Sequence, residues 1–357
     1  MDQLSKELGS ILPESRVAMF HRGSAGLYHL FRAIRVVGGV GEVVVPNLCC
    51  ETVALAAYFA GHRVIFCDVD IDRPLVTPET LAEALSASTV AVVIVHLFGL
   101  TIDPLDFKEI RKEHPQVVFI EDIAHAVGGC DKNGCEVGHG FDHAMFSFST
   151  SKILGGEGGV VATHRDDEIS DVFHRIFLDT PDCGYDPLLA LSLRNLVHAI
   201  ADLHRAGSEG AGGDVRQAIW ERFRPLIVGR GNFSDPGSAA SDLRDRGKIS
   251  RRRNDLAMLF LEENRNPQFK VPTILESETI WRLPVIAESE ALRRRATEAI
   301  RRSGISVSNH YFPLNRLFGA PALPASESVS DRLINLWVDD TVTKSQIRTV
   351  AKLLNEL

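Results

Sequence analysis

The chain has 357 residues, of which 45% are apolar and 24% are charged, and its formal net charge is −8. These values are typical of a globular protein with a large core and room for two domains. The acidic balance argues against a nucleic-acid partner. The start MDQLSKELGS has no secretory signal and no apolar run is long enough for a membrane span. The cysteines lack metal-site spacing, which predicts reduced thiols in a cytoplasmic protein; they are Cys49, Cys50, Cys67, Cys130, Cys135 and Cys183.

The first motif, RGSAGL at residues 22–27, precedes a stretch at 28–37 with helical periodicity. Glycine and serine before an amphipathic run place Ser24 at or near a helix N-cap. A helix start with a hydroxyl and free N–H groups can bind a phosphate. Most such serines only cap a helix, so this motif alone decides little.

The next part of the chain alternates strands with helices. This order predicts a mainly parallel sheet covered on both faces, and the β-branched run VAVVIV at 90–95 is typical of a strand buried on both sides. Strands are expected at 42–45, 64–67, 90–95 and 117–120, and helices at 51–60, 78–85 and 104–114.

A carboxylate, a small residue and an imidazole follow the last of these strands. Asp122, Ala124 and His125 stand just beyond residues 117–120, where open α/β sheets bind their ligands. Aspartate is also a common cap, so an Asp122 that only caps the next turn, with His125 packed beside it, is an equally good interpretation.

Residues 144–163, AMFSFSTSKILGGEGGVVAT, predict a strand, a hydroxyl-rich turn, a lysine, a glycine loop and a second strand. Lys152 has apolar neighbours, so desolvation should lower its pKa, as a Schiff-base lysine requires. Fully buried lysines are rare, and a surface lysine in a turn is the alternative.

Together these features favour pyridoxal phosphate (PLP) as the cofactor. Its aldehyde needs a lysine, its protonated ring nitrogen needs an anion, and its phosphate needs a helix N-terminus with hydroxyls. The nucleotide-binding patterns G-x-G-x-x-G and G-x-x-x-x-G-K-[ST] do not occur in the sequence.

The same motifs resemble those of the DegT/DnrJ/EryC1/StrS aminotransferases, sugar-nucleotide aminotransferases of fold type I, over nearly the whole chain. The most specific segments are 121–128 (EDIAHAVG) and 146–152 (FSFSTSK) with 157–159 (EGG). The resemblance implies an α/β three-layer sandwich with a mainly parallel mixed sheet, and a smaller C-terminal α+β domain. It implies the following roles: Lys152 for the Schiff base, Asp122 for the ring nitrogen, Ala124 against one ring face, His125 for the 3-hydroxyl, and Ser24, the Ala25 N–H and Ser147 for the phosphate.

Further positions follow from the resemblance. Cys50 stands where the family usually has an aromatic residue on the other ring face, and the N-terminus is short. Asn232, in GRGNF, resembles an asparagine that reaches the partner subunit's cofactor, which implies a homodimer with shared sites. His310 and Tyr311 resemble a His-Tyr segment that enters the active site and contacts substrate.

We predict that the chain divides into a large domain over 1–235 and a small one over 236–357. Helices are expected at 166–179, 250–263, 343–354 and from Ser289, and a strand at 279–285. A helical insertion at about 183–213 ends in a loose glycine-rich tip. Most insertions decorate the surface, and a substrate lid is the alternative.

We therefore expect a PLP-dependent aminotransferase that moves an amino group from glutamate or glutamine to a keto group on a nucleotide-linked sugar or a related small molecule. Two alternatives remain. One is dehydration or a carbon–carbon bond step on the same scaffold, although the family's sugar dehydratases replace the lysine by histidine. The other is a PLP-binding regulator without catalysis, which the intact Lys152, Asp122 and His125 argue against.

Overall fold

Two β-sheets organise the chain. The computed structural model describes residues 2–149, 151–182 and 212–357, with a few positions between (186, 188, 189, 191–193, 195, 196 and 199). The first sheet has seven strands in the order β1-β7-β6-β5-β4-β2-β3, and the second has four in the order β10-β11-β9-β8. The strands of the first sheet are β1 (Arg16–Phe20), β2 (Glu42–Pro46), β3 (Arg63–Cys67), β4 (Thr89–Val95), β5 (Val118–Asp122), β6 (His143–Ser147) and β7 (Gly159–Thr163).

Strands β2 to β6 of the large sheet run parallel, and β7 lies antiparallel between β1 and β6. The mainly parallel mixed sheet expected from the sequence is therefore confirmed. Strands β2, β5 and β7 are buried at every position, because helices cover both faces of a sheet whose strands are joined by crossovers. The carboxyl ends of the parallel strands consequently lie along one edge of the sheet.

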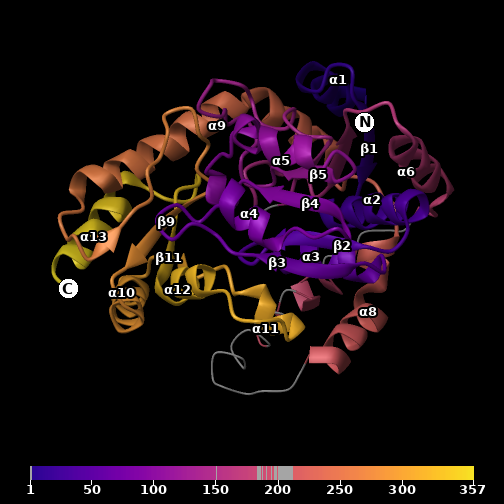
Figure 1. Ribbon diagram of the computed structural model, residues 1–357. Coiled ribbons are helices and arrows are strands. Elements are labelled where there is room, and N and C mark those ends of the chain that lie inside the picture. Colours follow the sequence, from indigo (N-terminus) through magenta and orange to yellow (C-terminus); the bar gives the residue numbers. More distant parts are fainter. Residues whose placement is uncertain are drawn as a thin grey trace.

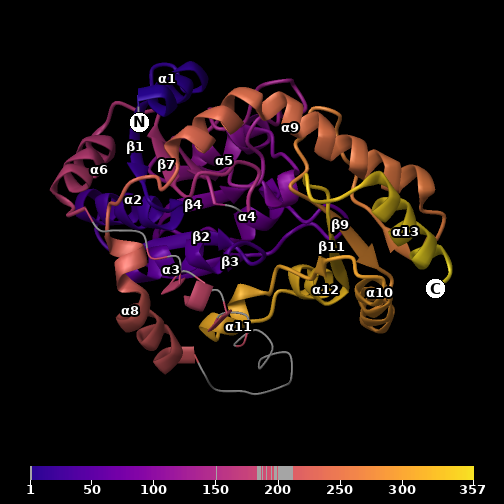
Figure 2. The same ribbon diagram turned by 180° about the vertical axis from the view of Figure 1, so that it is seen from behind.

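Helices surround this sheet, as Figures 1 and 2 show from opposite sides. Helix α2 packs on α3, α6 and α8 as well as on the sheet. Thr77 caps α4 through a reciprocal bond with Thr80, as its position before Pro78 predicts. The helices up to residue 228 are α1 (Asp2–Ile11), α2 (Gly23–Gly38), α3 (Glu51–Phe59), α4 (Pro78–Ala84), α5 (Lys108–Glu113), α6 (Glu168–Asp179) and α8 (Gly212–Val228), with short 3₁₀ turns at Leu97–Gly99 and Pro104–Phe107.

The smaller sheet and its helices form the C-terminal part of the chain. Helix α10 begins after the cap Ser289 and α13 after the cap Thr343, in agreement with the sequence. The strands are β8 (Phe269–Lys270), β9 (Arg282–Ala287), β10 (Val307–Ser308) and β11 (Leu333–Trp337), and the helices are α9 (Pro236–Glu263), α10 (Glu290–Arg302), α11 (Leu314–Phe318), α12 (Pro324–Arg332) and α13 (Lys344–Asn355).

Helix α9 is longer than the sequence predicted. It begins at Pro236, with Asp235 as its N-cap, and not at residue 250. Its first half packs on α1 and its second half on α13, so it passes from the large sheet to the small one (Figures 1 and 2). Few apolar residues mark its first turns, and periodicity therefore missed them. The domain boundary at 235/236 remains a prediction.

The insertion expected at about 183–213 is described only in part. Its described positions include Leu193, which packs in an apolar cluster with Phe223 of α8 and Phe312 of the C-terminal part. Residues 200–211, with most of the expected loose tip, lie outside the described residues. Gly212 and Gly213, predicted to be part of that tip, belong instead to α8. None of the described helices is both long and apolar enough to cross a bilayer.

Candidate functional site

A cavity of about 580 Å³ lies where the carboxyl edge of the large sheet meets the small sheet. Strands β4, β5 and β6 end there at Val95, Asp122 and Ser147, and all three residues line the cavity. Most of the residues proposed from the sequence line it as well: Ser24, Cys50, Asp122, Ala124, His125, Ser147, Lys152, His310 and Tyr311.

One end of this cavity is the N-terminus of α2. Arg22 is the N-cap and Ser24 is the second helical residue, so Ser24 lies near the cap, as the sequence predicts. The first N–H groups of a helix have no partner within the helix. The N–H groups around the buried Ala25 belong to this first turn, and the hydroxyl of Ser24 lies in the same turn. A Cβ on Gly159 would lie 2.2 Å from the Gly23 nitrogen, so only glycine lets β7 approach this turn so closely.

Asp122 is buried at the end of β5. One carboxylate oxygen accepts the N–H of Ala124 at 3.0 Å, so Asp122 does cap the turn, as one interpretation of the sequence predicts. Burial raises the pKa of Asp122, while the Ala124 N–H and the charge of Lys152 act in the opposite direction. A cationic ligand group beside this carboxylate would favour its ionised form.

Lys152 lies in the loop between β6 and β7, with its amine inside the cavity. Burial lowers its pKa, in agreement with the sequence, while Cys50, Asp122 and Glu51 act to raise it. Its Nζ lies 2.6 Å from Nε2 of His125. The lysine amine therefore contacts a buried imidazole and interacts electrostatically with a buried carboxylate, and desolvation favours the neutral amine.

His125 is neutral and its tautomer follows from its contacts. Burial lowers its pKa well below the usual value. Its Nδ1 accepts the backbone N–H of Phe98 at 3.4 Å, which places the proton on Nε2. Nε2 faces both Lys152 and the hydroxyl of Tyr311, 3.0 Å away. An Nε2 that carries the proton can donate to a neutral lysine amine, consistent with the lowered pKa of Lys152.

Trp281, the residue just before β9, closes the cavity on the side of the small sheet. Its ring stacks on His125 with the ring centres 3.9 Å apart and the planes 6° apart. Its indole N–H donates to the carbonyl of Ser151 at 2.7 Å, and Lys152 Nζ lies 5.0 Å from its ring centre. Cys50 lines the cavity from the start of α3, and burial raises the pKa of its thiol to about 11. The cavity thus contains an aromatic residue, Trp281, but this residue does not stand at the position of Cys50, where the family usually has one.

Asn232 lies outside this set. Its amide donates to the carboxylate of Asp182 at 3.1 Å, on the exposed surface. Ala25 is buried in α2 beside the cavity. Sequence reasoning missed Trp281, Arg282, Glu51 and Leu191, which also line the cavity. Trp281 was assigned only to a strand, since a strand pattern does not reveal which distant loop the side chain meets.

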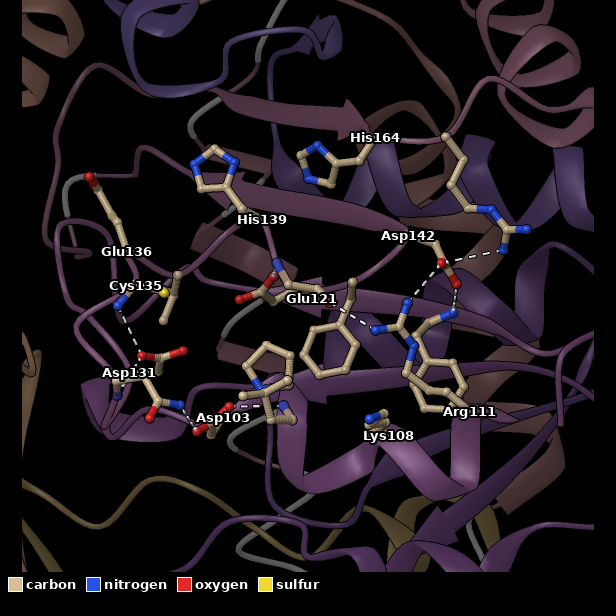
Figure 3. A pocket seen from close by; sticks show the side chains of 18 of the residues that line it. Asp103, Lys108, Arg111, Glu121, Asp131, Cys135, Glu136, His139, Asp142 and His164 are labelled. Atoms are coloured by element: carbon tan, nitrogen blue, oxygen red, sulfur yellow. Dashed lines mark hydrogen bonds and ion pairs between the residues drawn. The ribbon is translucent and has the colours of Figure 1, made fainter. Parts of the chain in front are cut away.

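A second, larger cavity of about 910 Å³ lies beside α5 and β5 (Figure 3). Successive strand residues point to opposite faces, so Glu121 points here while Asp122 points into the first cavity. Its acids are engaged by neighbours: Glu121 accepts from His96 at 2.8 Å, and Asp142 lies 3.3 Å from Arg111. It contains none of the residues proposed from the sequence.

The residues of the first cavity fit PLP. They supply a lysine amine with a lowered pKa, a buried carboxylate at the end of a strand, and hydroxyls at a helix N-terminus. These are the donor groups that an aldehyde, a ring nitrogen and a phosphate require.

Comparisons with known proteins agree with the family resemblance of the sequence motifs. Residues 1–178 match the model of the DegT/DnrJ/EryC1/StrS aminotransferase family. The chain is 34% identical over 153 residues to L-glutamine:2-deoxy-scyllo-inosose aminotransferase of Streptomyces fradiae, covering 43% of this chain and 35% of that protein. It is 36% identical over 143 residues to UDP-N-acetyl-3-dehydro-alpha-D-glucosamine 3-aminotransferase of Acidithiobacillus ferrooxidans, covering 40% and 38%. These matches span little more than a third of either relative.

The fold can be compared over the whole chain. The PLP-form structure of Spr1654 from Streptococcus pneumoniae has a TM-score of 0.75 at 17% identity, and the match covers 99% of this chain and 90% of that one. This likeness shows a shared fold. The match of the first 178 residues, which contain Lys152 and Asp122, identifies the chain as a member of the DegT/DnrJ/EryC1/StrS aminotransferase family.

Proposed function

We propose that the protein is a PLP-dependent aminotransferase that acts on a keto sugar or a related keto polyol. The observation that carries this proposal is one cavity lined by Lys152, Asp122 and the N-terminus of α2. Family membership supports the reaction type, and the names of the relatives support a keto-cyclitol or keto-sugar acceptor.

In this proposal the chain holds PLP by both ends. Lys152 binds the aldehyde carbon, and Asp122 holds the ring nitrogen in its protonated form. Ser24, Ser147 and the first N–H groups of α2 hold the phosphate. Ala124 lies against one ring face. Bound PLP supplies an electron sink for the carbanion that forms when the amino acid loses its α-proton.

Lys152 can accept that proton, and the residues around it orient its amine. A neutral amine is the form that can accept a proton, and burial favours it. His125 Nε2 and the hydroxyl of Tyr311 lie in one chain of contacts with Lys152 Nζ. They can orient the amine of Lys152 and any oxygen atom of a ligand that lies beside it. Trp281 covers His125 and excludes water from this side.

The donor is proposed to be glutamate or glutamine, and L-glutamine appears in the name of the Streptomyces fradiae relative. Each active site is proposed to be shared in a homodimer, with Asn232 reaching the partner's phosphate site. The exposed position of Asn232, away from its own chain's cavity, is compatible with a role across an interface. A fully active monomer in sedimentation analysis would contradict the shared site.

The direct test is to load the purified protein with PLP, reduce it with borohydride and locate the modified peptide by mass spectrometry. The cofactor should be found on Lys152, and Lys152→Ala should carry none. The loaded protein should then convert L-glutamate or L-glutamine to its keto acid once per site. A regulator would bind PLP without this turnover, and normal transamination by Lys152→Ala would refute the mechanism.

A further inference from the structure

An acid without a partner lines the first cavity. Glu51 is the first residue of α3, follows the N-cap Cys50 and is half-buried. Within the described part of the chain, neither a hydrogen bond nor an ion pair engages its carboxylate. The acids of the second cavity differ, because a histidine holds Glu121 and an arginine holds Asp142 (Figure 3). Neither the sequence motifs nor the proposed cofactor contacts give Glu51 a role.

The charge of Glu51 acts on the groups around Lys152. Burial is the main cause that lowers the pKa of Lys152, and the negative charge of Glu51 is among the causes that oppose this shift. Burial raises the pKa of Tyr311 and of Cys50, and Glu51 raises both further. The carboxylate of Glu51 therefore interacts electrostatically with the amine, the phenol and the thiol that line this cavity.

The next turn of α3 indicates which wall of the cavity carries Glu51. Leu55 is buried in one apolar cluster with Leu193 and with Phe312, the residue after Tyr311. Residues four apart lie on the same side of a helix. Glu51 thus lies on the side of α3 that faces the Tyr311 segment, where Leu193 also lines the cavity.

A carboxylate at this wall suits one of the two proposed substrates better than the other. An ionised carboxylate only accepts hydrogen bonds, and its two oxygens can accept from two donors at once. A keto sugar or keto polyol carries hydroxyl donors on neighbouring ring carbons. The amino donor brings carboxylates of its own, and like charges repel one another.

We propose that Glu51 binds hydroxyl groups of the keto acceptor and selects a polyhydroxylated ring. This inference rests on the proposed function for the class of the acceptor, and it adds that the ring must offer hydroxyls to the wall at the start of α3. A ring without hydroxyls would cover Glu51 without giving it a donor, and burial of an unpaired charge disfavours binding. Glu51 would thereby separate polyols from plain ketones.

The first test measures binding without reaction. scyllo-Inositol has a hydroxyl on each ring carbon and no keto group, and ligand-observed NMR can measure its dissociation constant from the protein loaded with pyridoxamine phosphate. Glu51→Gln should weaken binding by about 10- to 100-fold, the range for hydrogen bonds to a charged group. Glu51→Asp should fall between, because aspartate keeps the charge on a shorter side chain. Equal binding by wild type and Glu51→Gln, or no binding by wild type, would overturn the proposal.

Glu79 provides a matched control. It also lies in the first turn of a helix, α4, but it is exposed and does not line the cavity. Glu79→Gln should therefore bind scyllo-inositol as the wild type does. Equal weakening in both variants would mean a general effect of removing an acid from a helix start and would also overturn the proposal.

Two ketones test whether the hydroxyls are what Glu51 recognises. In single-turnover measurements below saturation, Glu51→Gln should slow the reaction of the pyridoxamine-phosphate-loaded protein with a keto-inositol by about 10- to 100-fold. The slower reaction with cyclohexanone, a ring without hydroxyls, should not fall. An equal loss with both ketones would show damage to the reaction itself and would overturn the proposal.

The donor half-reaction separates this inference from the proposed function. Glu51→Gln should bind L-glutamate as tightly as the wild type or more tightly, because a negative charge is removed. A defect confined to the donor half-reaction would overturn the acceptor assignment. If the wild type binds scyllo-inositol through Glu51 but turns over no amino acid, the proposed function fails and the polyol site stands.

Discussion

The stability of the protein should depend on pH through a buried histidine of the large sheet. His143 is the first residue of β6 and is fully buried. Within the described part of the chain neither ring nitrogen has a hydrogen-bond partner. Burial lowers its pKa from 6.5 to about 4; the charges of Asp142 and Asp167 oppose this shift. Protonation of His143 in the folded state is therefore unfavourable.

The sign and size follow from these two values. Between pH 6.5 and 4 the unfolded chain carries the proton and the folded chain does not, so the free energy of unfolding falls as the pH falls. A difference of about 2.5 pKa units corresponds to about 3 kcal/mol at 1.36 kcal/mol per unit. The slope for one proton is about 1.4 kcal/mol per pH unit.

The variant His143→Leu should remove this slope. Urea unfolding followed by tryptophan fluorescence, at several pH values from 7 to 4 and at one protein concentration, measures the free energy directly. The curve for His143→Leu should be flatter than that of the wild type by about 3 kcal/mol over this range. Some slope should remain, because burial also lowers the pKa of His29 and of His174 to about 4.

A histidine outside the core provides the control. His114 follows α5 and is only partly buried, so His114→Leu should leave the pH profile as it is in the wild type. The reasoning is refuted if His143→Leu and the wild type lose stability in parallel between pH 6.5 and 4.

Three further outcomes are expected. Asn47→Ala should lower the free energy of unfolding by about 3–5 kcal/mol in urea titrations, because buried Asn47 makes hydrogen bonds of 2.7–3.0 Å to Asn315 and Ser326; an unchanged midpoint would contradict this. Trp281→Phe keeps an aromatic ring but loses the indole N–H bond, so it should cost about 1 kcal/mol in the same assay. Asp122→Asn should retain PLP in absorbance titrations yet react with glutamate at least about 100-fold more slowly, as loss of a charge partner implies; a normal rate would exclude the role of Asp122.

Much of the fold and half of the candidate site can be predicted from local sequence. Strands such as β4 are recognised because burial on both faces leaves a continuous apolar run. Asp122 and Lys152 are recognisable because each lies at or just after the end of such a strand, and parallel strands bring their carboxyl ends to one edge. Local order along the chain thus determines which groups reach that edge.

The other half of the site depends on contacts between distant segments. Trp281 covers His125, and Arg282 lines the cavity, because the start of β9 and the residue before it lie against the edge of the large sheet. In the sequence both are ordinary residues at the start of a predicted strand. Periodicity reports which side of an element is buried and not what it is buried against. The packing of the two sheets alone decides that a tryptophan and an arginine, far along the chain, complete the environment of Lys152.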